Sequence, residues 1–188
     1  MNATTLIHPA TRRTLSDVTS DYLVEPDSAR LLQLGGMGLT VEVANERLAG
    51  RAAAMRIRLE ARRVIPPHLH HREDEVTFVL RGPIGVQVSH EEFEAPPGSL
   101  VVAPMDLFHA YWSPGDDHVE FVTFITPGGF EHFFEEFHSA FDSVNSGGVD
   151  PSEVAARRAT LADNYGLEHS RERLDALRER HGLRALGE

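Results

Sequence analysis

Hydrophobic and polar residues alternate through most of the middle of the chain. Leu39, Val41 and Val43 occupy every second position, and the apolar residues of segment 55–59 do the same. This alternation predicts half-buried strands, because successive side chains of a strand point to opposite faces. Further short strands are predicted at 75–81, 84–89, 92–95, 100–103, 107–112 and 119–126. Short strands separated by Gly and Pro indicate a β-sandwich or barrel.

Helical spacing replaces the alternation after residue 127. The phenylalanines of this part of the chain are Phe130, Phe133, Phe134, Phe137 and Phe141. They fall on one face of an amphipathic helix, which predicts that the helix packs on the barrel. A gate over an aromatic ligand is the alternative role for this face. A Gly- and Ser-rich linker at 145–151 precedes two further predicted helices, at 152–165 and 170–181.

Length and pattern together predict one moderate domain with flanking elements. The chain has 188 residues, of which 41% are hydrophobic, and this is enough to bury a real core. The elements divide it into an N-terminal arm (1–36), a β-barrel (37–127) and a C-terminal helical extension packed on the barrel (128–188). Within the arm, residues 28–34 are expected to form a short strand or helical turn.

Three histidines and one glutamate have the spacing of a metal site. His68 and His70 share one face of an extended strand, with their Cβ atoms roughly 6.6 Å apart. The charged run 71–74 predicts a solvated turn that brings Glu75 back to the same point. His109, in a later strand, is the natural fourth ligand. Such a set suits one divalent ion of Fe, Mn, Ni, Co, Cu or Zn, and affinity alone does not select among them.

The other histidines are not predicted to be ligands. His71 has the wrong parity for the strand face and is expected to stay in solvent. The remaining histidines have no partner at ligand spacing, and they are His8, His90, His118, His132, His138, His169 and His181.

The four expected ligands lie in two stretches that resemble the two signatures of the cupin superfamily. The stretch from Pro67 to Gly82 reads Pro-His-x-His, four residues, Glu, six residues, Gly, which is similar to the first signature. The stretch from Gly98 to Ser113 resembles the second, with Ser113 in place of the usual Asn and Asp106 in place of the usual Gly. Asp tolerates positive φ, so the turn is expected to survive. The resemblance covers about residues 50–127 and implies a mainly β, double-stranded β-helix (jelly-roll or cupin barrel) with a metal inside.

A closing string, residues 126–131, narrows the resemblance to small single-domain quercetin 2,3-dioxygenase-like proteins. That resemblance implies oxidative ring opening of a flavonol or related aromatic or enolic compound by dioxygen, with Glu75 leaving the metal to act as base. Two other classes stay open: a non-oxidative cupin enzyme (polyketide cyclase, isomerase or decarboxylase) and a non-catalytic binder of a small ligand. The candidates for lining the substrate cavity are Tyr111, Thr77, Met55 and Phe108.

The strand that begins at Glu75 is apolar on both faces. If Glu75 points inward, then Thr77 does too, and Val76, Phe78 and Leu80 point outward. The outward set needs cover from the N-terminal segment or from a second subunit. Cupins commonly pair through such a sheet, so we expect a homodimer.

Composition excludes several classes. The chain has no cysteine, which rules out disulfides, iron–sulfur clusters, thiolate zinc sites and cysteine nucleophiles. Its net charge of −11 disfavours nucleic acid and anionic membranes. A weak helix-turn-helix resemblance at 160–167 is discounted because Glu168, Glu172 and Asp175 lie where a recognition helix should be basic. The chain shows neither a membrane span nor a secretion signal, so the expected location is cytoplasmic.

Overall fold

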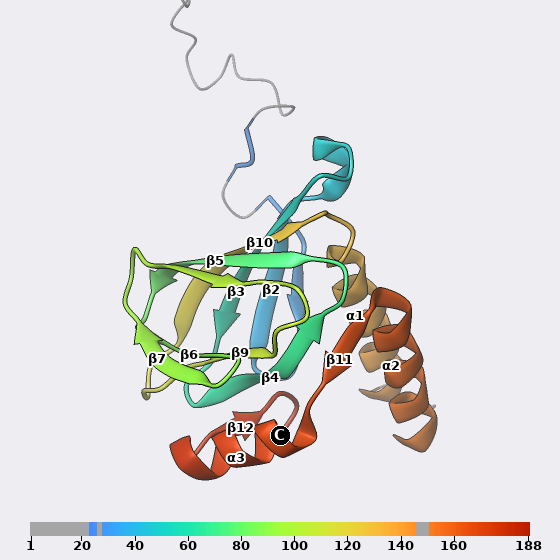
Figure 1. The fold of residues 1–188 in the computed structure, drawn as a ribbon. Helices are drawn as coiled ribbons and strands as arrows, with labels where there is room; N and C mark the ends of the chain where they lie inside the picture. Colours follow the sequence, from blue (N-terminus) through green and yellow to red (C-terminus); the bar gives the residue numbers. More distant parts are fainter. Residues whose placement is uncertain (1–22, 26–27, 146–150) are drawn as a thin grey trace, which may run out of the picture.

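The computed structural model describes residues 23–25, 28–145 and 151–188, and two β-sheets face each other in it (Figure 1). The first sheet contains, in spatial order, β1 (Leu31–Gln33), β2 (Met37–Val43), β3 (Ala53–Leu59), β10 (Val119–Thr126), β5 (Asp74–Arg81) and β8 (Leu100–Ala103). The second contains β11 (Leu167–His169), β4 (Arg63–His70), β9 (His109–Trp112), β6 (Ile84–Val88) and β7 (Glu91–Ala95), and β12 (Arg184–Ala185) pairs in parallel with β4. All other pairings are antiparallel. The predicted double-sheet β architecture with C-terminal helices is confirmed.

The core lies between the two sheets, where the alternating residues of facing strands meet. Leu39, Leu59 and Phe121 from the first sheet and Ile84 from the second are fully buried, and all belong to one hydrophobic cluster. The residues between them along each strand face outward, as the period of two requires. Each sequence segment that alternates therefore supplies one wall of the barrel.

Both flanking regions contribute strands to the sheets. β1 forms within the predicted arm and pairs with β2, whereas residues 1–22 of that arm lie outside the described residues. β11 and β12, from the predicted helical extension, both pair with β4. Neither of these two strands was expected from the sequence, because each is only two or three residues long and has no periodicity of its own.

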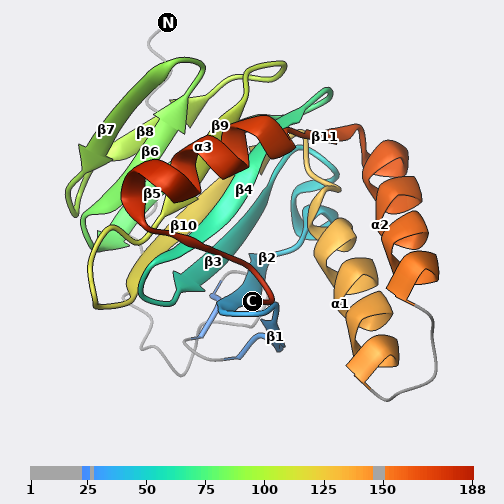
Figure 2. The same ribbon diagram turned by 90° about the horizontal axis from the view of Figure 1, so that it is seen from below.

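The helices cover two different parts of the barrel. α1 (Glu131–Asn145) and α2 (Pro151–Tyr165) lie side by side at one end, and α3 (Arg171–His181) lies across the outer face of the second sheet (Figure 2). A short 3₁₀ helix, Asn45–Leu48, precedes β3. None of the helices in the described part of the chain has the length and hydropathy needed to cross a lipid bilayer.

Packing and capping both hold α3 in place. Its Leu177 joins Leu183 against Val64, Ala110 and Trp112 on the outer face of the second sheet. The helix begins after Ser170, whose hydroxyl accepts a hydrogen bond from the backbone N–H of Arg173. It ends at Gly182, which has a left-handed φ of 63° and ends the helix where the sequence predicted.

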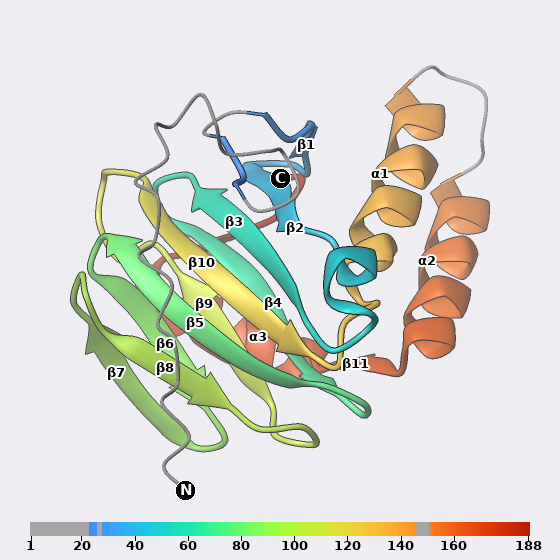
Figure 3. The same cartoon turned by 90° about the horizontal axis from the view of Figure 1, so that it is seen from above.

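The outer face of the first sheet, over β10, β5 and β8 (Figure 3), carries apolar side chains that are exposed in the described structure. On the edge strand β8, Val102 is 58% exposed and Leu100 is 63% exposed. They lie opposite Val76 and Phe78 of β5, respectively. On β10 the interpretation that both faces are buried is wrong for the chain as described: Phe121 is buried, but Phe124 on the other face is 45% exposed. The outward apolar set has no cover among the described residues.

The predicted homodimer can be tested at this face. We expect light scattering to give twice the chain mass of 20.9 kDa, and Val102→Asp to give the mass of a single chain. A buried, unpaired carboxylate in an apolar interface lowers the association constant of the dimer several-fold or more. Phe93→Asp, at an exposed apolar residue of the second sheet, is the control that should remain dimeric. A parent protein of single-chain mass at micromolar concentration would contradict the prediction.

Candidate metal centre

Two of the four expected ligands come from one strand, β4. His68 and His70 lie on the same face because they are two residues apart. Pro66 and Pro67 precede them inside the strand, at a register shift in the pairing between β4 and β9. Proline has no N–H to give to the ladder, so an irregular pairing tolerates it there. The strand thus continues through the prolines and presents both imidazoles to the barrel interior.

The other two ligands come from different strands and meet the first pair inside the barrel. His109 on β9 lies directly opposite His68 in the register of the second sheet. Glu75 on β5 comes from the first sheet, and its Oε2 lies 3.6 Å from Nε2 of both His70 and His109. One ligand atom from each of the four side chains lies within 4.8 Å of every other. The structure therefore brings together all four residues that the sequence singled out.

The orientation of the imidazoles fits a metal ion. Nδ1 of His68 lies 2.8 Å from the carbonyl oxygen of Pro66, and Nδ1 of His109 lies 3.0 Å from that of Leu107. A carbonyl oxygen only accepts, so each Nδ1 carries the proton and each Nε2 keeps its lone pair. Nε2 of His70 and of His109 are buried without a hydrogen-bond partner among the described residues. Three imidazole nitrogens and a carboxylate converging on one point are a donor set that suits a divalent transition metal.

The charges of the group are strongly coupled. Burial raises the pKa of Glu75, but the close contacts and charge interaction with His109 and His70, each 3.6 Å from Oε2, outweigh it and hold the pKa well below its usual range. Burial, followed by the charges of His109 and His70, pushes the pKa of His68 well below normal. Burial also lowers the pKa of His109, but the contacts with Glu75 outweigh this and raise it. The site therefore holds an ionised carboxylate that needs a positive partner, and a cation provides one.

Hydroxyl groups support Glu75 from the side opposite the imidazoles. Thr77 donates a hydrogen bond from Oγ1 to Oε1 of Glu75 at 3.1 Å, and its Oγ1 lies 2.8 Å from that of Thr123 on β10. Tyr111 is buried on the same face of β9 as His109. Burial and the charge of Glu75 raise the pKa of Tyr111 well above its usual value, so the phenol keeps its proton.

Two adjacent cavities are lined in part by the ligands. The inner one, lined by His68, Glu75, Tyr111 and Met55 among others, has a volume of only about 30 Å³. The outer one has a volume of about 330 Å³ and lies between the barrel and the helix pair α1–α2. They share the lining residues Met37, Ile65, His68, Phe130 and Phe134. The outer cavity therefore reaches the ligand cluster at His68.

The phenylalanines of the amphipathic helix pack on the barrel, as predicted, and also line a cavity, whereas the gate over an aromatic ligand stays a prediction. Phe130 and Phe133 are buried and belong to the hydrophobic core, while Phe134 and Phe137 are half-buried against it. All four also line the outer cavity. Phe141 belongs to the part of α1 whose side chains are not described.

The expected substrate-binding residues are placed differently from one another. Tyr111 and Met55 line the inner cavity, and Thr77 is buried behind Glu75. Phe108 lines neither cavity. Its ring lies under the guanidinium of Arg173 on α3, 5.0 Å from the centroid, because it has the parity of the outward-facing residues of β9. The expectation that Phe108 lines the cavity is therefore corrected.

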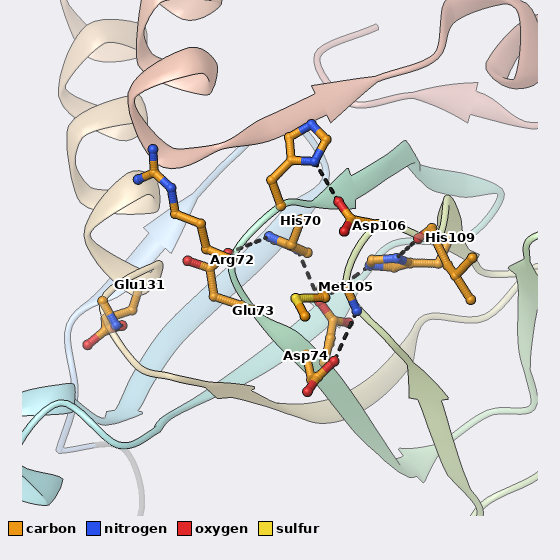
Figure 4. Close-up of polar contacts among 12 residues, drawn as sticks. His70, Arg72, Glu73, Asp74, Met105, Asp106, His109 and Glu131 are labelled. Carbon is orange, nitrogen blue, oxygen red and sulfur yellow. Dashed lines mark hydrogen bonds and ion pairs between the residues drawn. The ribbon is translucent and has the colours of Figure 1, made fainter.

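Sequence reasoning missed two residues near the ligands. His169 on β11 pairs with His68 in the sheet, lines the outer cavity, and has its ring centroid 6.1 Å from that of His68. Burial, followed by the charge of His70, lowers the pKa of His169. Glu73 was expected in a solvated turn but is only 8% exposed, and its Oε2 lies 3.6 Å from Nδ1 of His70 (Figure 4). The charged run itself gives no signal that singles out Glu73.

His71 and Asp106, in two neighbouring turns, are placed as predicted. His71 is exposed, and its Nδ1 lies 2.7 Å from Oδ1 of Asp106. Asp106 has a φ of 62°, so it adopts the left-handed conformation that was expected where it replaces glycine.

Comparison with known proteins assigns the domain. Residues 55–125 match the cupin domain family. Among solved structures, a predicted oxalate decarboxylase from Thermotoga maritima has a TM-score of 0.53 at 15% identity, covering 56% of this chain and 98% of its own. An RmlC-like cupin from Shewanella frigidimarina has a TM-score of 0.51 at 14% identity, covering 60% and 96%. Comparison with curated proteins gives no match. The two structural likenesses show that the barrel has the cupin fold.

Proposed function

We propose, on the premise that residues 55–125 form a cupin domain, that this protein is a metal-dependent dioxygenase that opens a ring of a flavonol or a related aromatic or enolic compound. The observation that carries the proposal is the phenylalanine-lined cavity of about 330 Å³ that reaches His68, one of the four clustered ligands. Cavities of this size and apolar character suit small organic ligands.

The sizes of the two cavities support an aromatic substrate that enters from the helix side. The inner cavity, at about 30 Å³, is far smaller than the outer one at about 330 Å³, so the ring system of a substrate is expected to lie in the outer cavity. There Phe130 and Phe133 stack at 5.1 Å between centroids, and Phe134 is edge-on to both. Aromatic walls in these orientations favour a flat, apolar ligand. Only one edge of the substrate would then reach the metal ligands.

The chemistry follows from the donor set. When bound, a redox-active divalent metal would stabilise the anion of a substrate hydroxyl and make its reaction with dioxygen possible. Glu75 is ionised and is the one carboxylate among the described residues that lines the inner cavity, so it can accept the proton of that hydroxyl. Thr77 occupies Oε1 of Glu75 and leaves Oε2 for the cation or the proton. Both oxygen atoms enter the products in a dioxygenase reaction, so no external reductant is required.

The test is oxygen consumption by protein loaded separately with Fe, Mn, Co, Ni, Cu or Zn. With flavonols and related phenols we expect one mole of oxygen to be consumed per mole of substrate, the substrate being followed by its absorbance. We expect this for at least one redox-active metal and not for metal-free protein. Turnover without oxygen uptake would instead indicate a cyclase, isomerase or decarboxylase. Thermal stabilisation by the ligand without any turnover would indicate a binding protein. Either outcome would reject the dioxygenase.

A further inference from the structure

The three imidazoles of the site are oriented by two different kinds of partner. Nδ1 of His68 and Nδ1 of His109 each face a backbone carbonyl oxygen two residues earlier in the chain. Nδ1 of His70 faces instead the carboxylate of Glu73, at 3.6 Å from Oε2 (Figure 4). His70 is therefore the one ligand imidazole, of the three, that has a charged group behind it.

Glu73 is buried with an oxygen that has no other partner. Its residue is 8% exposed, and Oε2 has no hydrogen-bond partner in the part of the chain that the structure describes. Nδ1 of His70 is also buried and lacks a hydrogen bond there. Burying a carboxylate without a donor is costly, and the separation of 3.6 Å is only slightly longer than a hydrogen bond. A small side-chain rotation would satisfy both atoms at once.

A proton between these two atoms has consequences for the metal. If it lies on Nδ1 of His70, then Nε2 keeps the lone pair that points toward Glu75 and the cation position. If it lay on Glu73, the carboxyl O–H would donate a hydrogen bond to Nδ1. The neutral imidazole would then have its own hydrogen on Nε2, which would block coordination. Only the first arrangement gives His70 the same tautomer as His68 and His109.

We propose that Glu73 is a positioning residue, which accepts the Nδ1–H of His70 and thereby fixes the tautomer and increases the donor strength of that metal ligand. The proposal rests on the metal site of the proposed function. Its physical basis is general, since a carboxylate behind a ligating imidazole holds the ring and makes the coordinating nitrogen more basic. Glu73 is not one of the four clustered ligands and lines neither cavity, so its effect is expected to pass through His70.

The neighbouring turn supplies a matched control. His71 and Asp106 form a second imidazole–carboxylate contact, with 2.7 Å between Nδ1 and Oδ1, but both side chains are about half exposed or more, and His71 is not among the ligands. Asp106→Asn removes the carboxylate of this pair. Asparagine also tolerates the left-handed φ of that position, so the turn should be unchanged.

The experiment measures metal affinity and the tautomer of His70 in Glu73→Ala, Glu73→Gln and Asp106→Asn. Competition with a chromophoric chelator, using Co²⁺ or Zn²⁺ as the probe, should show an affinity about 10- to 100-fold lower in Glu73→Ala. Glu73→Gln should lose less, because the amide oxygen still accepts the proton but carries no charge. Asp106→Asn should bind as the parent does. Circular dichroism reports whether each variant is folded.

¹H–¹⁵N NMR of the histidine ring nitrogens in the metal-free proteins reports the tautomer of His70. It therefore separates a positioning role of Glu73 from a merely structural one. We expect the Nδ1–H form of His70 in the parent and in Glu73→Gln, and a shift toward the Nε2–H form in Glu73→Ala. Folded Glu73→Ala with parental affinity would overturn the proposal while the metal site remained, since His109→Ala would still lose the metal. A parent that binds no metal would reject the proposed function and this inference together. If Glu73→Ala does not fold, Glu73→Gln decides by the same two measurements.

Discussion

We expect that the variant His109→Ala no longer binds one metal ion per chain, while its barrel stays folded. Four-ligand sites bind with apparent energies of about 10–16 kcal/mol, so one ligand contributes on the order of 3 kcal/mol, or more than about 100-fold in affinity. His109 is fully buried opposite His68, and no other described histidine on its strand can replace it. The measurement is metal per chain after dialysis against a weak chelator. His68→Ala should behave in the same way.

The fold survives this change because the core does not depend on the ligands. The buried cluster between the sheets is built from aliphatic and aromatic side chains, and the histidines line only one end of it. His71→Ala is the matched control: it removes a histidine adjacent to His70 that is exposed and faces Asp106, and it should keep full metal content. Undiminished metal content in His109→Ala would show that the ion binds outside the four-ligand cluster.

Glu75→Gln is expected to lower the turnover of the metal-loaded enzyme by about 10²- to 10⁴-fold, which is the range that a general base contributes. The amide has nearly the same shape and can still accept from Thr77 at Oε1, so the cavity is preserved. It carries no negative charge and cannot take up a proton from the substrate. The measurement is the rate of oxygen uptake per bound metal, with flavonol at saturation.

Metal content decides how this result is interpreted. Glu75 is one of the ligands, so the rate is normalised to the metal actually bound in each variant. Asp74→Asn is the control, because Asp74 is the adjacent carboxylate, is exposed on the other face of β5, and accepts only the backbone N–H of Met105 in the described structure. We expect it to keep parental turnover. Parental turnover in Glu75→Gln would exclude Glu75 as the base.

The sequence was informative where a property depends on neighbours along the chain. Alternation identified the strands because the period of two is set by the strand itself, and it placed Leu39 and Phe121 in the core. Parity likewise put His68 and His70 on one face and turned Val76 outward. Asp106 could be assigned a left-handed turn because it replaces the Gly of the second cupin signature and aspartate tolerates that conformation. His109 required the spacing of a second motif, since nothing local connects it with His70.

Contacts between distant segments could not be predicted in this way. Phe124 is apolar but exposed, because cover for an outer sheet face must come from another part of the chain or another molecule. Phe108 faces α3 instead of the cavity, and His169 reaches the ligand cluster only because β11 pairs with β4. The three-residue strand β11 has no pattern of its own to predict that pairing.

The sequence by itself therefore determined the strands, the face on which each ligand lies, and the donor set of one cation site. Only the tertiary structure decided that Glu73 is buried behind His70 and that the α1–α2 pair encloses an aromatic cavity beside His68. The physical reason is that parity and turn preference are properties of a few consecutive residues. Burial and cavity shape are set by which segments, far apart in the chain, pack against one another.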